Sequence, residues 1–117
     1  MDPLRRQLTD ERAAKLLDAV NMLRDLDDEF PAQLLASLLY VASHNKCHKQ
    51  AMEEDLAFTT ASGSRNTDRL SKQHRLKKPG LDFVIKEPDP SNRRRLQLKM
   101  TPKGQVFIDQ LLSALYD

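Results

Sequence analysis

The stretch Asp89-Pro-Ser-Asn-Arg-Arg-Arg-Leu-Gln-Leu-Lys-Met-Thr-Pro-Lys-Gly104 carries more structural information than any other part of the chain. Prolines at positions 88 and 90 lack a backbone N–H, so residues 88–92 are expected to form a hairpin turn and not a sheet centre. Arg93, Arg94 and Arg95 follow this turn directly. The stretch therefore predicts a hairpin with a strongly basic tip.

A strand is expected on each side of the turn, and a helix after the second strand. Residues 81–86 and 95–100 show the two-residue alternation of apolar side chains that is typical of strands. The alternating apolar positions are Leu81, Phe83, Ile85, Leu96, Leu98 and Met100. Thr101 is expected to cap the helix 102–116, in which Pro102 takes the first position.

Two amphipathic helices are expected in the first part of the chain. Helix 8–26 would begin at Thr9, a good capping residue followed by two acidic residues. Helix 31–42 would begin at Pro31, and it is the most apolar segment of the sequence. We therefore expect it to lie at the centre of the core.

Two more helices are expected before the hairpin. The helix 49–57 would turn Met52 inward and the acidic residues Glu53, Glu54 and Asp55 outward. The helix from about 60 to 74 has few apolar anchors, which indicates that its exposed face is used for contacts. This order of elements predicts a winged helix-turn-helix, an α+β fold that is mainly α with a small β-hairpin.

Composition limits the class of protein. Hydrophobic residues make up 39% of the chain and charged residues 31%, and the chain length suits one domain. No apolar run is long enough for a membrane span and no signal-peptide pattern opens the chain. Cys47 is the single cysteine, so an internal disulfide is excluded. We expect a cytoplasmic protein of bacterial or bacteriophage origin, without a membrane partner.

The charge is distributed unevenly along the chain. Residues 1–64 contain 7 Lys/Arg and 11 Asp/Glu, whereas residues 65–103 contain 12 Lys/Arg and 4 Asp/Glu. A basic block inside an otherwise acidic chain indicates a polyanionic partner. A solvated charged face is the alternative.

The polar helix and the basic hairpin suit two different parts of double-stranded DNA. A helix fits the major groove, where Arg and Asn side chains read base edges and hydroxyls bind phosphate. The candidate DNA-binding residues of this helix are Thr59, Thr60, Ser62, Ser64, Arg65, Asn66, Arg69 and Lys72. Arg93, Arg94 and Arg95 of the hairpin would contact the backbone or the minor groove. A polar surface helix and a solubilising edge hairpin are the alternatives.

Asp89 is the candidate residue for orienting the hairpin tip. It stands at the start of the turn, within reach of the arginines that follow. We expect its carboxylate to pair with Arg93 or Arg94 across the turn and to fix the direction of the tip.

The run from Asp89 to Gly104 resembles the wing and the following helix of the multiple antibiotic resistance regulator (MarR) family. Met100-Thr101-Pro102-Lys103-Gly104 fills the family pattern Leu-Thr-Pro-x-Gly. Upstream, residues 54–57 are similar to the first helix of the helix-turn-helix, and Thr67-Asp68-Arg69-Leu70 to the recognition helix. The resemblance covers about residues 8–116 and implies homodimeric, DNA-binding transcriptional regulators.

In this family, helices from both ends of the chain form the dimer interface. The resemblance thus implies one domain, 1–117, with dimerisation helices at 8–26 and 102–116 and a DNA-binding core at 31–100 whose wing is about 81–100. The implied dimerisation residues are Leu16, Val20, Leu23, Ile108, Leu111, Leu112 and Leu115.

Three departures from the family pattern are visible. Asn66 and Thr67 are polar where the family is usually apolar, residues 73–80 lengthen the connection to the wing, and the chain stops about one helix short. Many family members bind small phenolic ligands beside the dimer region. Because that region is shortened, we expect no small-molecule effector.

Other chemistry is weakly indicated. His44, Cys47 and His48 have metal-ligand character, but their spacing matches no strong zinc motif, and we expect neither a metal nor another cofactor. No nucleophile and base arrangement or glycine-rich phosphate loop is present, so we expect no enzyme. The sequence favours a DNA-binding regulator, with repression as the expected mode. The alternative is a winged-helix module that binds an acidic protein, such as a component of the transcription machinery.

Overall fold

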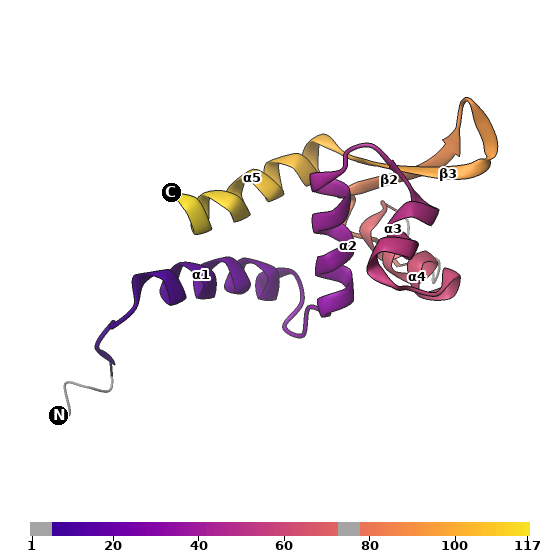
Figure 1. Cartoon of the computed structure of the whole chain (residues 1–117). Coiled ribbons are helices and arrows are strands. Elements are labelled where there is room, and N and C mark those ends of the chain that lie inside the picture. Colours follow the sequence, from indigo (N-terminus) through magenta and orange to yellow (C-terminus); the bar gives the residue numbers. More distant parts are fainter. Residues whose placement is uncertain (1–5, 73–77) are drawn as a thin grey trace. The chain divides into compact units, whose positions relative to one another are not determined.

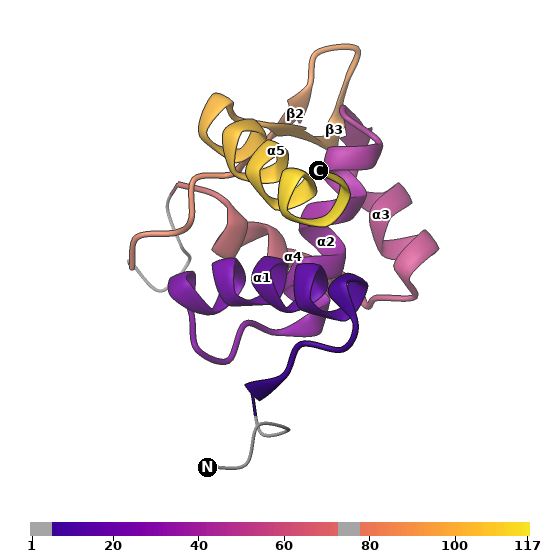
Figure 2. The same cartoon turned by 90° about the vertical axis from the view of Figure 1, so that its left-hand side faces the viewer.

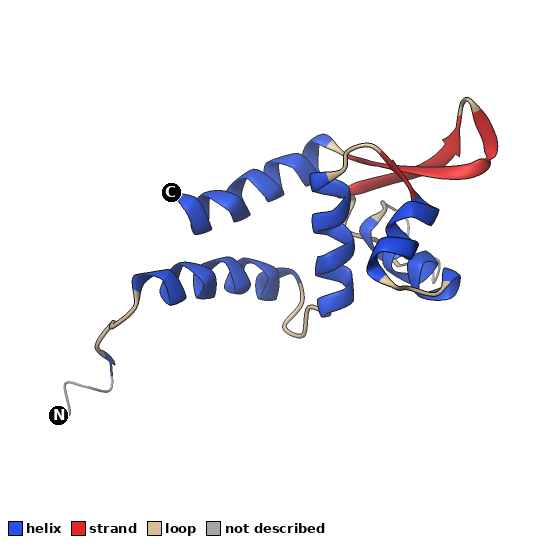
Figure 3. Ribbon diagram, in the orientation of Figure 1, coloured by secondary structure: helices blue, strands red, loops and turns tan. Residues whose placement is uncertain are grey.

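The computed structural model describes residues 6–72 and 78–117. In these ranges the elements are α1 (Glu11–Leu26), α2 (Ala32–Ser43), β1 (Cys47–His48), α3 (Lys49–Leu56), α4 (Thr60–Leu70), β2 (Val84–Asp89), β3 (Asn92–Met100) and α5 (Pro102–Tyr116) (Figures 1 and 3). The predicted winged helix-turn-helix with its mainly α composition is confirmed. None of the described helices is long and apolar enough to cross a membrane.

The chain divides into two compact units. One unit comprises Met1–Phe30 with Asp109–Asp117, and the other comprises Pro31–Ile108. In the first unit, α1 is capped by Asp10 and not by the predicted Thr9. The Asp10 carboxylate accepts the backbone N–H of Arg12 at 2.9 Å and that of Ala13 at 3.4 Å. A carboxylate is favoured there because it also faces the positive end of the helix dipole.

The core of the second unit is built on α2, as its apolar sequence predicts. Leu34, Leu38 and Val41 are fully buried, and Met52 of α3 and Leu70 of α4 are equally inaccessible. Leu39, predicted in the same apolar stripe, is 39% exposed because it lies on the opposite face of the helix.

A three-stranded antiparallel sheet has the order β1-β3-β2. Val84 pairs with Met100 and Pro88 with Leu96, so β2 and β3 form the predicted wing hairpin, which extends beyond the helices α2–α4 (Figure 2). β1 was not predicted. Its two residues pair with Gln97 and Leu98 of β3 and add a third strand at the base of the wing.

The face of β2 that packs inward differs from the predicted one. Val84 is 1% exposed and Ile85 37%, whereas the alternation around Leu81, Phe83 and Ile85 placed Ile85 inward. Asp82 has a left-handed backbone (φ 59°), which breaks the extended chain before the strand begins. Phe83, which precedes the strand, and Val84, its first residue, are both buried, so the predicted alternation does not hold here.

The start of α5 agrees with its sequence signal. The Thr101 hydroxyl accepts the N–H of Gly104 at 2.9 Å and donates to the carbonyl of Asp82 at 2.6 Å. A Cβ at position 104 would lie 2.2 Å from the backbone oxygen of Phe83, so glycine is needed for this close approach. The cap therefore joins the helix to the segment that enters the wing.

Candidate nucleic-acid interface

The helix-turn-helix consists of α3 and α4 joined by a short turn. Ala57 ends α3 in the left-handed conformation (φ 57°), and the Thr59 hydroxyl begins α4 by accepting the N–H of Ser62 at 3.1 Å. This turn seats α4 against α2, α3 and β2 through Gly63, Thr67 and Leu70, which form its buried face.

The opposite face of α4 carries the candidate groove-reading residues. Thr59, Thr60 and Arg65 are exposed, whereas Ser62, Ser64, Asn66 and Arg69 are half-buried. The Arg65 guanidinium donates to the Ser62 hydroxyl at 3.1 Å, which holds the arginine along the helix surface. Arg65 is thus the exposed cation of this helix that is best placed to reach a base edge.

Asn66 and Lys72 differ from their predicted positions. The Asn66 amide donates to the carbonyl of Ser62 at 2.9 Å and to the Gln33 side chain at 3.4 Å, so its donor group already has partners within the fold. Asn66 is therefore less suited to read adenine than its sequence position indicates. We predicted a helix to about residue 74, but α4 ends at Leu70, and Lys72 is exposed beyond the helix. The last residues of the predicted helix, 73 and 74, lie outside the described residues.

Polar side chains help to hold α4 in place at Thr67. Thr67 is fully buried, and its hydroxyl donates to the carbonyl of Gly63 at 2.8 Å. The Lys86 ammonium of β2 donates to the same hydroxyl at 3.2 Å and forms an ion pair with Asp68. Lys86 therefore links α4 to β2. The helix and the wing, which carry the two sets of candidate DNA-binding residues, are held together by this side chain.

Replacing Lys86 by methionine is expected to lower the free energy of unfolding by about 1–2 kcal/mol, because a part-buried charged donor is removed. Urea unfolding followed by circular dichroism measures the change. Lys99→Met is the control, since Lys99 pairs with Glu87 at 3.1 Å with both side chains more than a third exposed. It is expected to cost less than about 0.5 kcal/mol. Equal losses in the two variants would show that Lys86 is not a specific support.

A second polar contact sets the approach of α3 to α4. Glu53, predicted to point outward, is 8% exposed and binds the ammonium of Lys49 at 2.5 Å. Its carboxylate lies against Gly63, where an added Cβ would come within 1.9 Å of its Oε2. The glycine, which weakens α4 intrinsically, is required because the buried ion pair occupies the space of a side chain.

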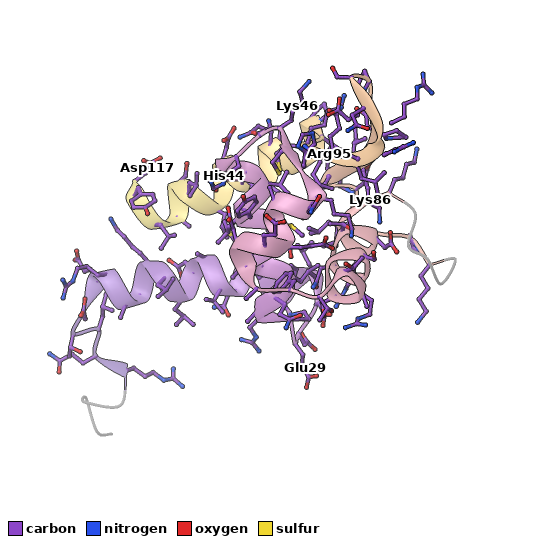
Figure 4. All side chains as sticks on the ribbon, turned by 45° about the vertical axis from the view of Figure 1, so that its right-hand side comes forward. Glu29, His44, Lys46, Lys86, Arg95 and Asp117 are labelled. Carbon is purple, nitrogen blue, oxygen red and sulfur yellow. The ribbon has the colours of Figure 1, made fainter. Side chains whose placement is uncertain are left out.

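The wing presents its arginines to solvent. β3 begins at Asn92, so Arg93, Arg94 and Arg95 all belong to the strand, and all three are exposed (Figure 4 labels Arg95). The turn itself is shorter than predicted and consists of Pro90 and Ser91. Three consecutive cations on a projecting hairpin are suited to contact phosphates along a groove.

Asp89 has a different partner from the expected one. Its Oδ2 lies 2.6 Å from Nε2 of His48 on β1, and its Oδ1 accepts the N–H of Ser91 at 2.8 Å. The predicted pairing with Arg93 or Arg94 is wrong, because β1, which sequence reasoning missed, brings the imidazole to the carboxylate. The hydrogen bond from His48 and then that from Ser91 hold the pKa of Asp89 below its usual range.

The three residues with metal-ligand character are separated by their own contacts. The ring of His44 stacks on Tyr40 with 4.1 Å between centroids, while His48 binds Asp89. Burial raises the pKa of the Cys47 thiol, which disfavours the thiolate. In the described ranges, no group of three potential ligands comes together.

Comparison with solved structures places this architecture among known folds. Over 91% of the chain it matches a mutant MarR from E. coli complexed with operator DNA, with a TM-score of 0.64 and 19% identity. The YusO protein from Bacillus subtilis (87% of the chain, TM-score 0.61, 18% identity) and the PcaV transcriptional regulator from Streptomyces coelicolor (89%, 0.63, 17%) match similarly. The chain has the MarR-type winged-helix fold.

This MarR-type fold is supported by structure and not by overall sequence similarity. No family model and no curated protein matches the sequence. The chain spans 66% of the MarR and YusO chains and 68% of the PcaV chain. The match therefore shows the fold, and the function has to be argued from the residues described above.

Proposed function

We propose that this chain is a sequence-specific, double-stranded DNA-binding transcriptional regulator that acts as a homodimeric repressor. The observation that carries the proposal is the exposed run Arg93–Arg95 on a wing that Lys86 joins to the recognition helix. In this arrangement α4 would enter the major groove, and the wing would contact the adjacent backbone or minor groove. The solved MarR complexed with operator DNA has the same fold, which supports the proposal.

The homodimer is proposed from apolar side chains left at the surface of the unit that contains α1. Leu16 is 54% exposed and Val20 39%, one turn apart on α1, and Leu112 of α5 is 40% exposed. Leu23, Ile108 and Leu111, which were implied as dimerisation residues, are at most 5% exposed in the single chain, and Leu115 is half-buried. We therefore assign dimer contacts to the exposed subset, with Leu17 and Tyr116 added.

A selection of duplexes from a random pool tests the function. If the chain binds as proposed, the selected sites contain two inverted half-sites whose centres are about one helical turn apart. A protein-interaction module with the same fold would enrich no sequence. The internal hydrogen bonds of Asn66 are compatible with that second candidate, because they reduce the polar groups available to bases.

Arg65→Ala is expected to weaken binding to the selected duplex by about 10- to 100-fold and binding to random duplex much less, because a bidentate base contact is lost. Fluorescence anisotropy with both duplexes measures the difference. Arg65→Lys is the matched control, since it keeps the charge but not the planar fork. Arg65→Lys should bind random duplex as tightly as wild type does, but it should not prefer the selected duplex. Equal losses on selected and random duplexes in Arg65→Ala would contradict direct readout.

A further inference from the structure

His48 lies where the sheet of the second unit meets the tip of the wing. It is the last residue of β1 and pairs in register with Gln97 of β3. Its imidazole reaches across β3 to the far end of β2, where Nε2 lies 2.6 Å from Oδ2 of Asp89. The side chains are 36% and 15% exposed, so the contact is partly shielded from water.

Asp89 stands at the bend between the regular ladder and the tip. The strand register shifts between Pro88, which faces Leu96, and Asp89, which faces Asn92. The second oxygen of the Asp89 carboxylate accepts the N–H of Ser91 in the turn. One carboxylate therefore connects β1 to the two-residue turn that precedes the arginines.

We infer that His48 is a positioning residue for the wing: it holds Asp89, and through Asp89 the direction of the arginine tip, most strongly when its imidazole is protonated. The inference rests on the proposed DNA-binding function. A bond between charged groups is about twice as strong as a neutral one, and histidine changes its charge near neutral pH. The neutral imidazole can still donate from Nε2, so deprotonation weakens the hold without removing it.

The other titratable or charged groups around His48 come from its own segment, from α3 and from β3. Lys46 and Cys47 precede it on its own segment, and Lys49 and Glu53 of α3 line the same small hollow as Arg94 and Arg95. Lys49 and Glu53 neutralise each other at 2.5 Å. Lys46 and the two arginines bring positive charge to the surroundings of His48, and Asp89 is the carboxylate that binds it directly.

The alternative role for a histidine beside a basic wing is direct contact with phosphate. Both roles give tighter DNA binding at low pH. They differ in their dependence on Asp89, since a phosphate contact does not need the carboxylate and would gain from its removal. Asp89→Asn therefore separates positioning from contact.

The experiment measures anisotropy of a random-sequence duplex at pH 6 and pH 8 with wild type, His48→Gln, Asp89→Asn and the double variant. Wild type is expected to bind about fivefold more tightly at pH 6, from the stronger charged bond. His48→Gln, whose amide can donate to Asp89 without titrating, should bind as wild type does at pH 8 and lose the pH dependence. Because His48 acts only through Asp89, the double variant His48→Gln/Asp89→Asn should bind no more weakly than Asp89→Asn alone. His44→Gln is the control and should keep the wild-type pH dependence.

A pH dependence that survives in His48→Gln or in Asp89→Asn would overturn the inference. Backbone amide NMR relaxation of residues 91–94 in free protein gives a reading that does not need DNA. The tip of wild type should be more rigid at pH 6 than at pH 8, and His48→Gln should show no difference. If this holds while no variant binds duplex, the DNA-binding function fails and the positioning role stands. An unchanged tip in wild type would overturn the positioning role itself.

Discussion

The double variant Arg94→Ala/Arg95→Ala is expected to bind every duplex sequence more weakly, by roughly 50-fold at 0.1 M salt, with the log–log salt slope reduced in magnitude by about 2. Both side chains are exposed on β3, beside the turn that projects from the sheet. Each phosphate contact releases a counterion, and the loss of two contacts removes that release from binding. Because phosphates carry no sequence information, selected and random duplexes should lose affinity alike.

Anisotropy titrations at several salt concentrations measure both the affinity and the slope. The matched control is Arg12→Ala/Arg24→Ala, which removes the same charge from exposed positions on α1. It should change affinity by less than about threefold, since neither arginine belongs to the proposed DNA-binding residues. Binding by the wing variant as tight and as salt-dependent as that of wild type would show that the wing does not contact DNA.

Lys49→Met is expected to lower the free energy of unfolding by about 3 kcal/mol. Lys49 and Glu53 are 6% and 8% exposed, and the substitution leaves the Glu53 carboxylate buried without its cation. The carboxylate lies against Gly63, so its movement toward water would also disturb the packing of α3 on α4. For a domain of this size the loss is a large part of a total stability of roughly 5–15 kcal/mol.

Urea unfolding measures this loss, and the double variant Lys49→Met/Glu53→Leu supplies the control. Replacing both partners by apolar groups should return most of the stability, because the cost comes from the unpaired charge and not from the lost attraction. A loss below about 1 kcal/mol in Lys49→Met would show that water reaches the Glu53 carboxylate. A double variant no more stable than Lys49→Met would show that the unpaired Glu53 charge is not the cause of the loss.

Local patterns were sufficient for the elements that make the wing and the core. Prolines 88 and 90, the alternation over 95–100 and the Thr101 cap predicted β3, its turn and the start of α5, because each depends on a few neighbouring residues. The alternation was wrong for the buried face at one end of its range, since Leu96 is 38% exposed and Gln97 5%. The apolar content of α2 identified its place in the core for the same reason. The predicted ends of the helices were less accurate. The helix expected to about residue 74 ends at Leu70, where the Ser71 N–H donates to carbonyls in the last turn of α4.

What the sequence did not reveal depends on partners far away in the chain. β1 has two residues and no pattern of its own, and it exists because Cys47 pairs with Leu98. Glu53 stands in an acidic run that predicts a solvent-facing position. Its burial depends on the ion pair with Lys49 and on the space that Gly63 leaves free. The role of Asp89 at the wing stays a prediction, but its partner His48 required the missed strand.

The measurement that tests the central claim most directly is anisotropy of a labelled random-sequence duplex titrated with the full chain from low to moderate salt. The account predicts binding at micromolar protein or tighter at low salt, with a log–log slope that indicates several phosphate contacts. Sites selected from a random pool should then bind more tightly than random duplex at every salt concentration. Absence of duplex binding at micromolar protein and low salt would contradict the account and favour a winged-helix module that binds protein.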